Sequence, residues 1–296
     1  MAYSLLRNWM LSVLLVVVSC SLGASAVKAQ DSDGPARILF VTQSQGFRHG
    51  SVTRSEERPL SPAERVMTEL GISSNLFRVD CTQDVATDFT REKLQHYDIV
   101  MFYTTGDLPI AEADLEYFFN DWLKQPGHGM LGTHSAADTF HNYEPYWDAL
   151  GGTFNGHPWN AGDTVTISVH DTDHPASEVW GDEFTIRDEI YQFKNWQPEK
   201  VRVLMSLNME KTGLKKPYHV PILWVKEYGE GKVMHMSLGH NESVWENETY
   251  QNSLLGESSG CWARWKATRL PTPNSAKSRI QGGEAAGRVS HDMDSP

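Results

Sequence analysis

The sequence has few cysteines, fewer basic than acidic residues and no apolar run long enough to span a membrane comfortably. Its cysteines form no Cys-x-x-Cys pair, and Cys81 and Cys261 are too far apart to indicate a disulfide framework. The formal net charge is -12, and no basic stripe is present. Proteins that bind nucleic acid concentrate lysine and arginine to neutralise phosphate. We therefore expect no nucleic-acid partner, and structural or incidental roles for these two cysteines.

Three common catalytic signatures are also missing. The sequence has no His-Glu-x-x-His, no Gly-x-x-x-x-Gly-Lys loop and no Gly-x-Ser-x-Gly elbow. Any chemistry must therefore come from residues that the fold brings together. The composition, 40% hydrophobic and 22% charged, is ordinary for a soluble globular protein that builds a full core.

The first residues have the features of an export signal. A positive charge precedes an apolar run from Trp9 to Ser19, and small-residue cleavage sites end at Ala26 and Ala29. Alternatively, the run ends in a lipobox-like segment in which Cys20 would become a lipid anchor. The run is shorter than the roughly 20 residues that a membrane-spanning helix needs. We expect residues 1–29 to direct the protein to the periplasm or the outside of the cell.

The rest of the chain indicates one domain, residues 36–266, followed by a disordered tail, residues 268–296, that is poor in large apolar residues. Strands alternate with helices in the first half, which predicts right-handed crossovers and a mainly parallel sheet. Shorter connections later predict an antiparallel extension of the same sheet. The expected strands are 37–42, 75–79, 98–103, one that starts near Met130 and leads to His134, 164–169, 201–207, 222–226 and 232–237.

Two helices are expected between the early strands. Ser61 and Pro62 are typical of a helix start, and Gly71 is expected to close this helix after Leu70. A second helix is expected over 111–124, where large apolar residues recur at helical spacing.

Histidines follow several of the predicted strands. His49, His134 and His240 each lie just beyond an apolar run, and Glu189 belongs to an Asp-Glu-Ile-Tyr segment. Ligands of open α/β sheets bind outside the carboxyl ends of the strands. Imidazole and carboxylate groups together suit a divalent ion such as zinc, manganese or nickel. His49, His134, Glu189 and His240 are therefore the candidate metal ligands.

Each candidate also has a simpler interpretation. A loop histidine such as His49 is often only solvated, and His157 before Pro158 would shape a turn. Glu189 would form a surface ion pair with Arg187 or a lysine.

The order of these pieces resembles the trehalose-utilisation family, the ThuA-like proteins. The resemblance covers the chain from about Arg37 to Trp265. It is carried by six segments in order: Gly46-Phe47-Arg48-His49, Gly132-Thr133-His134-Ser135-Ala136, Leu150-Gly151-Gly152-Thr153-Phe154 with Gly156-His157-Pro158, Asp173-His174-Pro175, Asp188-Glu189-Ile190-Tyr191, and Pro221-Ile222-Leu223-Trp224-Val225 through Gly239-His240.

The resemblance implies a flavodoxin-like fold, similar to class I glutamine amidotransferases. In those enzymes the turn after the corresponding strand carries a nucleophilic cysteine, and the last strand leads to a catalytic histidine. Here His134 stands at the position of the nucleophilic cysteine, and His240 resembles the catalytic histidine. Without the thiol, amidotransfer through a thioester is excluded.

The resemblance also implies a substrate class, because ThuA-like proteins tend to be associated with sugar dehydrogenases that make 3-keto-glycosides. A metal on the ketone oxygen would stabilise an enolate while a base removes the C2 proton. We expect His157, Asp138 and Tyr191 to serve catalysis, the first two by moving protons. Sugar-stacking faces are expected among the aromatic residues, with core packing as the alternative for each: Trp159, Tyr191, Trp196 and Trp245.

Two other functions stay open at this stage. One is a carbohydrate-binding or scaffold protein without turnover, which would need stacking aromatic residues but no histidine and carboxylate cluster. The other is a partner subunit of a sugar oxidoreductase.

Overall fold

The computed structural model describes residues 34–213 and 219–256. The predicted export signal, Cys261 and the predicted tail lie outside the described residues, and those expectations stay predictions. In the part of the chain that the structure describes, no helix has both the length and the apolar character that crossing a membrane requires.

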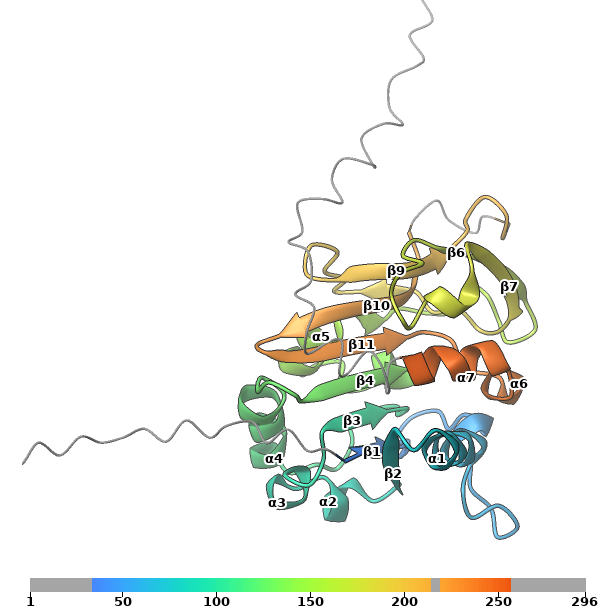
Figure 1. Cartoon of the computed structure of the whole chain (residues 1–296). Helices are drawn as coiled ribbons and strands as arrows, with labels where there is room; N and C mark the ends of the chain where they lie inside the picture. Colours follow the sequence, from blue (N-terminus) through green and yellow to red (C-terminus); the bar gives the residue numbers. More distant parts are fainter. Residues whose placement is uncertain (1–33, 214–218, 257–296) are drawn as a thin grey trace, which may run out of the picture. The chain divides into compact units, whose positions relative to one another are not determined.

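A nine-stranded sheet forms the centre of the domain, with strand order β2-β1-β3-β4-β11-β10-β9-β6-β7 (Figure 1). The first five strands in this order are parallel, and the other four are antiparallel to their neighbours. The strands are β1 (Ala36–Val41), β2 (Phe77–Thr82), β3 (Ile99–Phe102), β4 (Gly129–Thr133), β6 (Thr164–Val169), β7 (Glu183–Arg187), β9 (Arg202–Leu207), β10 (Pro221–Tyr228) and β11 (Gly231–Met236).

This topology confirms the expected fold class. With β11 counted as the fifth parallel strand, the parallel part has the order 2-1-3-4-5 of flavodoxin-like sheets. The strands β10, β9, β6 and β7 form the expected antiparallel extension. The segment 232–237 was expected to belong to this extension, but as β11 it is parallel to β4 and closes the parallel part of the sheet. A separate small pair, β5 (Thr153–Phe154) with β8 (Phe193–Lys194), is antiparallel.

Helices cover both faces of the parallel strands (Figure 1). Alternate residues of β1 enter different cores, since Ile38 and Phe40 belong to one cluster and Leu39 and Val41 to the other. Such a strand, buried on both faces, is typical of a parallel sheet. The helices α1 (Pro62–Ser74), α6 (Glu242–Trp245) and α7 (Glu248–Leu255) contact one another on one face. The other core is built with α2 (Val85–Asp88), α3 (Arg91–Leu94), α4 (Glu112–Tyr117) and α5 (Glu144–Leu150).

Four short helical turns complete the described elements. They are η1 (Gly50–Val52), η2 (Phe118–Trp122), η3 (His134–Asp138) and η4 (Glu178–Trp180). Of these, η2 continues α4, so the expected helix over 111–124 is present as two joined segments.

The expected end of the first helix is wrong. Ser61 caps α1 as expected, in a capping box with Glu64, but the helix continues past Gly71 and ends at Ser74. Asn75 takes the left-handed conformation at φ 55° that Gly71 was expected to supply. Gly71 serves close packing instead, since a Cβ there would lie 2.9 Å from the carbonyl oxygen of Phe77. The next strand is displaced accordingly, to 77–82.

The parallel arrangement brings four loops to one edge. The strands β1, β3, β4 and β11 pair in parallel, so their carboxyl ends lie together at one edge of the sheet. The residues that follow β1, β4 and β11 include His49, His134 and His240.

Candidate metal centre

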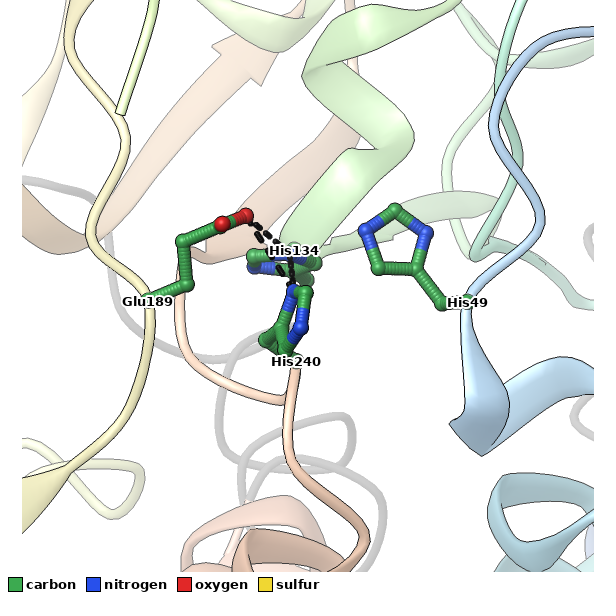
Figure 2. A group of neighbouring side chains, drawn as sticks. All are labelled: His49, His134, Glu189 and His240. Carbon is green, nitrogen blue, oxygen red and sulfur yellow. Dashed lines mark hydrogen bonds and ion pairs between the residues drawn. The ribbon is translucent and has the colours of Figure 1, made fainter. Parts of the chain in front are cut away.

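Four of the predicted site residues converge at this edge. One ligand atom from each of His49, His134, Glu189 and His240 lies within 4.8 Å of the others. Figure 2 shows His134 and His240 between Glu189 on one side and His49 on the other. Three of the residues are buried and His240 is half-buried. The predicted convergence of these residues is therefore confirmed, while a metal-binding role stays a prediction.

His134 is held in an unusual backbone conformation directly after β4. Its φ is 43°, in the left-handed region where a residue with a Cβ is strained, and it opens the helix η3. Its Nδ1 lies 3.0 Å from the carbonyl oxygen of Ser237. A carbonyl oxygen only accepts, so Nδ1 carries the proton and donates. In the neutral ring, Nε2 therefore presents a lone pair to the cluster.

The loop that carries His240 is fixed by the buried carboxylate of Asp188. One oxygen of Asp188 accepts hydrogen bonds from the backbone N–H groups of Gly239 (2.7 Å) and His240 (3.3 Å), and the other accepts from Asn241 (2.9 Å). Burial raises the pKa of Asp188, although the charge on a protonated His134 and these N–H groups act in the opposite direction. Asp188 therefore positions His240 without joining the cluster itself.

Side chains from three other segments bind the same loop. Tyr103 and Trp245 both donate to the carbonyl oxygen of Gly239, at 2.7 Å and 2.9 Å. Ser51, just after His49, donates to the carbonyl oxygen of His240 at 2.8 Å. The loops after β1 and β11 are thereby tied together.

Three ligand atoms form a compact triangle. Glu189 Oε2 lies 3.2 Å from His240 Nδ1 and 3.5 Å from His134 Nε2, and the two nitrogens are 3.3 Å apart. Burial tends to raise the pKa of Glu189, but hydrogen bonds with His134 and His240 outweigh it and lower that pKa. Burial tends to lower the pKa of His240, but the hydrogen bond and charge of Glu189 raise it. Glu189 is therefore a carboxylate at neutral pH. Its ion-pair partners are His134, His157 and His240, and not Arg187 or a lysine as the simpler interpretation expected.

His49 closes the cluster from the side of β1. It is 2% exposed, so the solvated-loop interpretation is wrong. Its ring meets those of His134 and His240 edge-on, with centroids 4.9 Å and 5.0 Å apart. Burial first, and then the neighbouring His134 and His240, lower the pKa of His49 to about 2, so this ring is neutral at ordinary pH.

The three predicted catalytic residues lie at different distances from the cluster. His157 Nδ1 is 3.1 Å from Glu189 Oε1, and its side chain is 45% exposed. The ring of Tyr191 lies against that of His134, with centroids 4.3 Å apart. Asp138 ends the helix that His134 begins, but its carboxylate contacts His141 at 2.8 Å instead of a cluster residue.

The core-packing alternative holds for two of the four predicted stacking residues. Trp159 and Trp245 are 2% and 0% exposed. Trp196 is half-buried and packs against Trp224 at 5.0 Å. Tyr191 is also buried, yet it borders the cluster. Asp188 is the functional residue that sequence reasoning missed, although its place beside Glu189 in an apolar and aromatic segment was the available signal.

Comparisons with known proteins agree with this architecture. The model of the family ThuA, described as trehalose utilisation, matches residues 37–258. A ThuA-like protein from Bacteroides uniformis is 20% identical, with a TM-score of 0.59 over 79% of this chain and 94% of that one. A ThuA-like protein from Parabacteroides merdae is 15% identical, with a TM-score of 0.57 over 80% and 93%. These identities show likeness of fold alone. A search of curated proteins finds no match to the chain.

Proposed function

This chain belongs to the ThuA family, and from that membership and its histidine–glutamate cluster we propose an exported metal-dependent enzyme that cleaves or isomerises 3-keto-glycosides. The observation that carries the proposal is the set of four ligand atoms within 4.8 Å of one another. The family description, trehalose utilisation, supports a carbohydrate substrate.

The triangle of ligand atoms fits a divalent cation. Ligands about 2.0–2.1 Å from a tetrahedral metal are separated from one another by about 3.3 Å. The three separations among His134, Glu189 and His240 are 3.2–3.5 Å. Moreover, when the His134 ring is neutral and carries its proton on Nδ1, His134 Nε2 and Glu189 Oε2 are both acceptors, and they face each other at 3.5 Å. Two acceptors in this position repel unless a proton or a cation lies between them. These residues, with His49, would hold zinc, manganese or nickel.

When bound, the cation would supply Lewis-acid polarisation of the ketone oxygen at C3 of the sugar. The chain itself supplies the base. The carboxylate oxygen of Glu189, 3.1 Å from His157 Nδ1, favours the proton on that nitrogen. In the neutral ring Nε2 then keeps its lone pair, and His157 is exposed enough to meet a substrate. His157 is therefore the proposed acceptor of the C2 proton.

Bond cleavage follows from the loss of that proton. The electron pair of the C2–H bond forms a double bond between C2 and C1, and the C1–O bond breaks with its electrons on the leaving oxygen. The leaving oxygen takes up a proton, and water then adds across the double bond, so the net reaction is hydrolysis. This route needs no pair of opposed carboxylates of the usual glycosidase kind.

Asp138 is the proposed proton source, and Tyr191 is the proposed hydrogen-bond donor. Burial raises the pKa of Asp138, although His141 acts in the opposite direction, so Asp138 keeps its proton to a higher pH than an exposed aspartate. Burial and the charge of Glu189 raise the pKa of Tyr191. Its hydroxyl therefore stays neutral and able to donate to a sugar oxygen.

The decisive experiment replaces His134 by asparagine, which tolerates the left-handed backbone better than alanine does. The proposal expects metal content and 3-keto-glycoside cleavage to fall together. His96→Asn is the matched control, because His96 is exposed and lies outside the cluster. A metal-free preparation that cleaves at the normal rate would contradict the metal role. Full metal binding without cleavage of any 3-keto-glycoside would favour the carbohydrate-binding alternative.

The export part of the proposal has its own test. Mass spectrometry of the protein from its native cells should find a chain that starts after Ala26 or Ala29, or a lipid-modified Cys20. A chain that retains Met1 would contradict export and leave the enzymatic proposal untouched.

A further inference from the structure

Phe47 is an exposed aromatic residue beside the cluster. Its side chain is 66% exposed, whereas most large apolar residues in the described part of the chain are buried. Its ring meets the ring of His49 edge-on, with centroids 4.8 Å apart. An exposed apolar side chain is unremarkable by itself. What singles out Phe47 is the combination of exposure and contact with a cluster residue.

The backbone around Phe47 is held by the loop after β3, which fixes where the side chain leaves the main chain. The hydroxyl of Thr105, which is fully buried, donates to the carbonyl oxygen of Phe47 at 2.9 Å and accepts from the N–H of Gly46 at 3.2 Å. The carbonyl oxygen of Thr105 accepts from the N–H of Gln45 at 2.8 Å. Gly106 has a φ of 74°, and a Cβ there would lie 2.9 Å from the nitrogen of Gly46. The loop after β1 is therefore seated closely on the loop after β3.

Phe47 and the proposed base contact different members of the cluster. Phe47 contacts His49, and His157 contacts Glu189. Figure 2 places His49 and Glu189 on opposite sides of His134 and His240. A sugar whose ketone oxygen lies at the cluster therefore has the base toward one end and the ring of Phe47 toward the other.

We propose that Phe47 binds substrate by stacking on the C–H groups of the keto-sugar ring, at its C4 to C6 side. This inference rests on the proposed function. With the C3 ketone at the cluster and the C2 hydrogen at His157, C1 and its leaving group extend past His157. The remaining carbons, C4, C5 and C6, extend the other way, toward Phe47. Sugar C–H groups present an apolar face that an aromatic ring matches.

The position predicts a specific kinetic pattern. Phe47→Ala should raise KM about five- to tenfold, the scale of one lost aromatic contact, with little change in kcat. The fold increase in KM should be the same for methyl and nitrophenyl 3-keto-glucosides, because the leaving group does not touch Phe47. Phe47→Trp should restore binding, and Phe47→Leu should not. Ile72→Ala is the matched control, since Ile72 is 67% exposed and lies on α1.

Metal content, measured on the same variants, separates substrate contact from support of His49. It should stay at the wild-type level in Phe47→Ala. A loss of metal in that variant, regained in Phe47→Leu, would show that Phe47 only packs against His49 and would overturn the inference. An unchanged KM, or a fold increase in KM that depends on the leaving group, would overturn the inference as well.

A second measurement distinguishes this inference from the proposed function. Saturation-transfer NMR detects binding of methyl glucoside without any reaction. If the wild type cleaves nothing but binds methyl glucoside through Phe47, catalysis is wrong and the stacking role holds. If cleavage occurs and Phe47→Ala equals the wild type in both assays, the stacking role is wrong and the proposed function stands. If no glycoside binds at all, both fail.

Discussion

Replacing Asp188 by asparagine tests how the loop of His240 is positioned. The carboxylate of Asp188 is 0% exposed and accepts three backbone N–H groups. Asparagine has nearly the same shape, but one of its two polar atoms is an NH₂ group that cannot accept. At least one of the N–H groups of residues 239–241 would then lose its acceptor.

The size of the effect follows from the burial of these groups. An unsatisfied buried donor costs about 1–3 kcal/mol in the free energy of unfolding. In a domain of this size about 1 kcal/mol lowers Tm by roughly 2–4 °C. We therefore expect Asp188→Asn to lower Tm by about 2–12 °C. Displacement of His240 should also weaken metal binding about 10–100-fold, the usual effect of losing a group that orients a ligand.

Two assays on one matched pair of variants measure both effects. Calorimetric unfolding of metal-free protein gives the stability, and isothermal titration with zinc gives the affinity. Asp163→Asn is the control, because Asp163 also accepts a backbone N–H, from Asn160 at 2.8 Å, but in a turn that is open to solvent. If the two variants have equal Tm, or if Asp188→Asn binds zinc as tightly as the wild type does, the positioning role of Asp188 is refuted.

Three further predictions concern the stability of the metal-free protein. Glu64→Gln should lower the free energy of unfolding in urea by about 2–4 kcal/mol, because Glu64 is fully buried while its partner Arg54 is 30% exposed; a change below 1 kcal/mol would contradict this. Burial, and to a lesser extent His134, lowers the pKa of His235 to about 3. The unfolded chain therefore takes up a proton below about pH 6.5 that the folded chain refuses, and stability should fall with decreasing pH by about 1.4 kcal/mol per unit. His235→Leu should remove this part of the pH dependence, which urea unfolding between pH 7 and pH 5 measures. Gly132→Ala should lower Tm through about 1–3 kcal/mol of overpacking, because its Cβ would lie 2.5 Å from His235 Nδ1; an unchanged Tm would show that the ring moves freely aside.

An element of the fold could be predicted from the sequence when its signal lies in neighbouring residues. The strand 164–169 was predicted at its observed bounds because Val165, Ile167 and Val169 alternate with threonine and serine, which is the period-two pattern of a strand. The strand β7 was missed, although its burial alternates along Glu183–Arg187 as expected for an edge strand. The role of Gly71 could not be predicted, because it depends on the approach of Phe77 from another element.

The residues of the site also differ in whether local sequence signals reveal them. His134 and His240 were found because each follows a strand, and parallel strands share one edge. Phe47 and Asp188 were not assigned their roles. The sequence alone does not show whether a phenylalanine is exposed or buried. The acceptor role of Asp188 depends on N–H groups that lie about fifty positions later in the chain.

The cluster draws its four ligands from segments spread over most of the domain. The hydrogen bond from Ser51 to His240 alone spans 189 positions. No isolated hairpin or helix pair contains the site, so it forms only when β11 has inserted beside β4. Metal ions present during refolding would then neither nucleate the fold nor trap its intermediates, and would stabilise only the finished sheet. The proposed metal would thus report complete folding, and in refolding experiments zinc uptake should trail every spectroscopic signal of secondary structure.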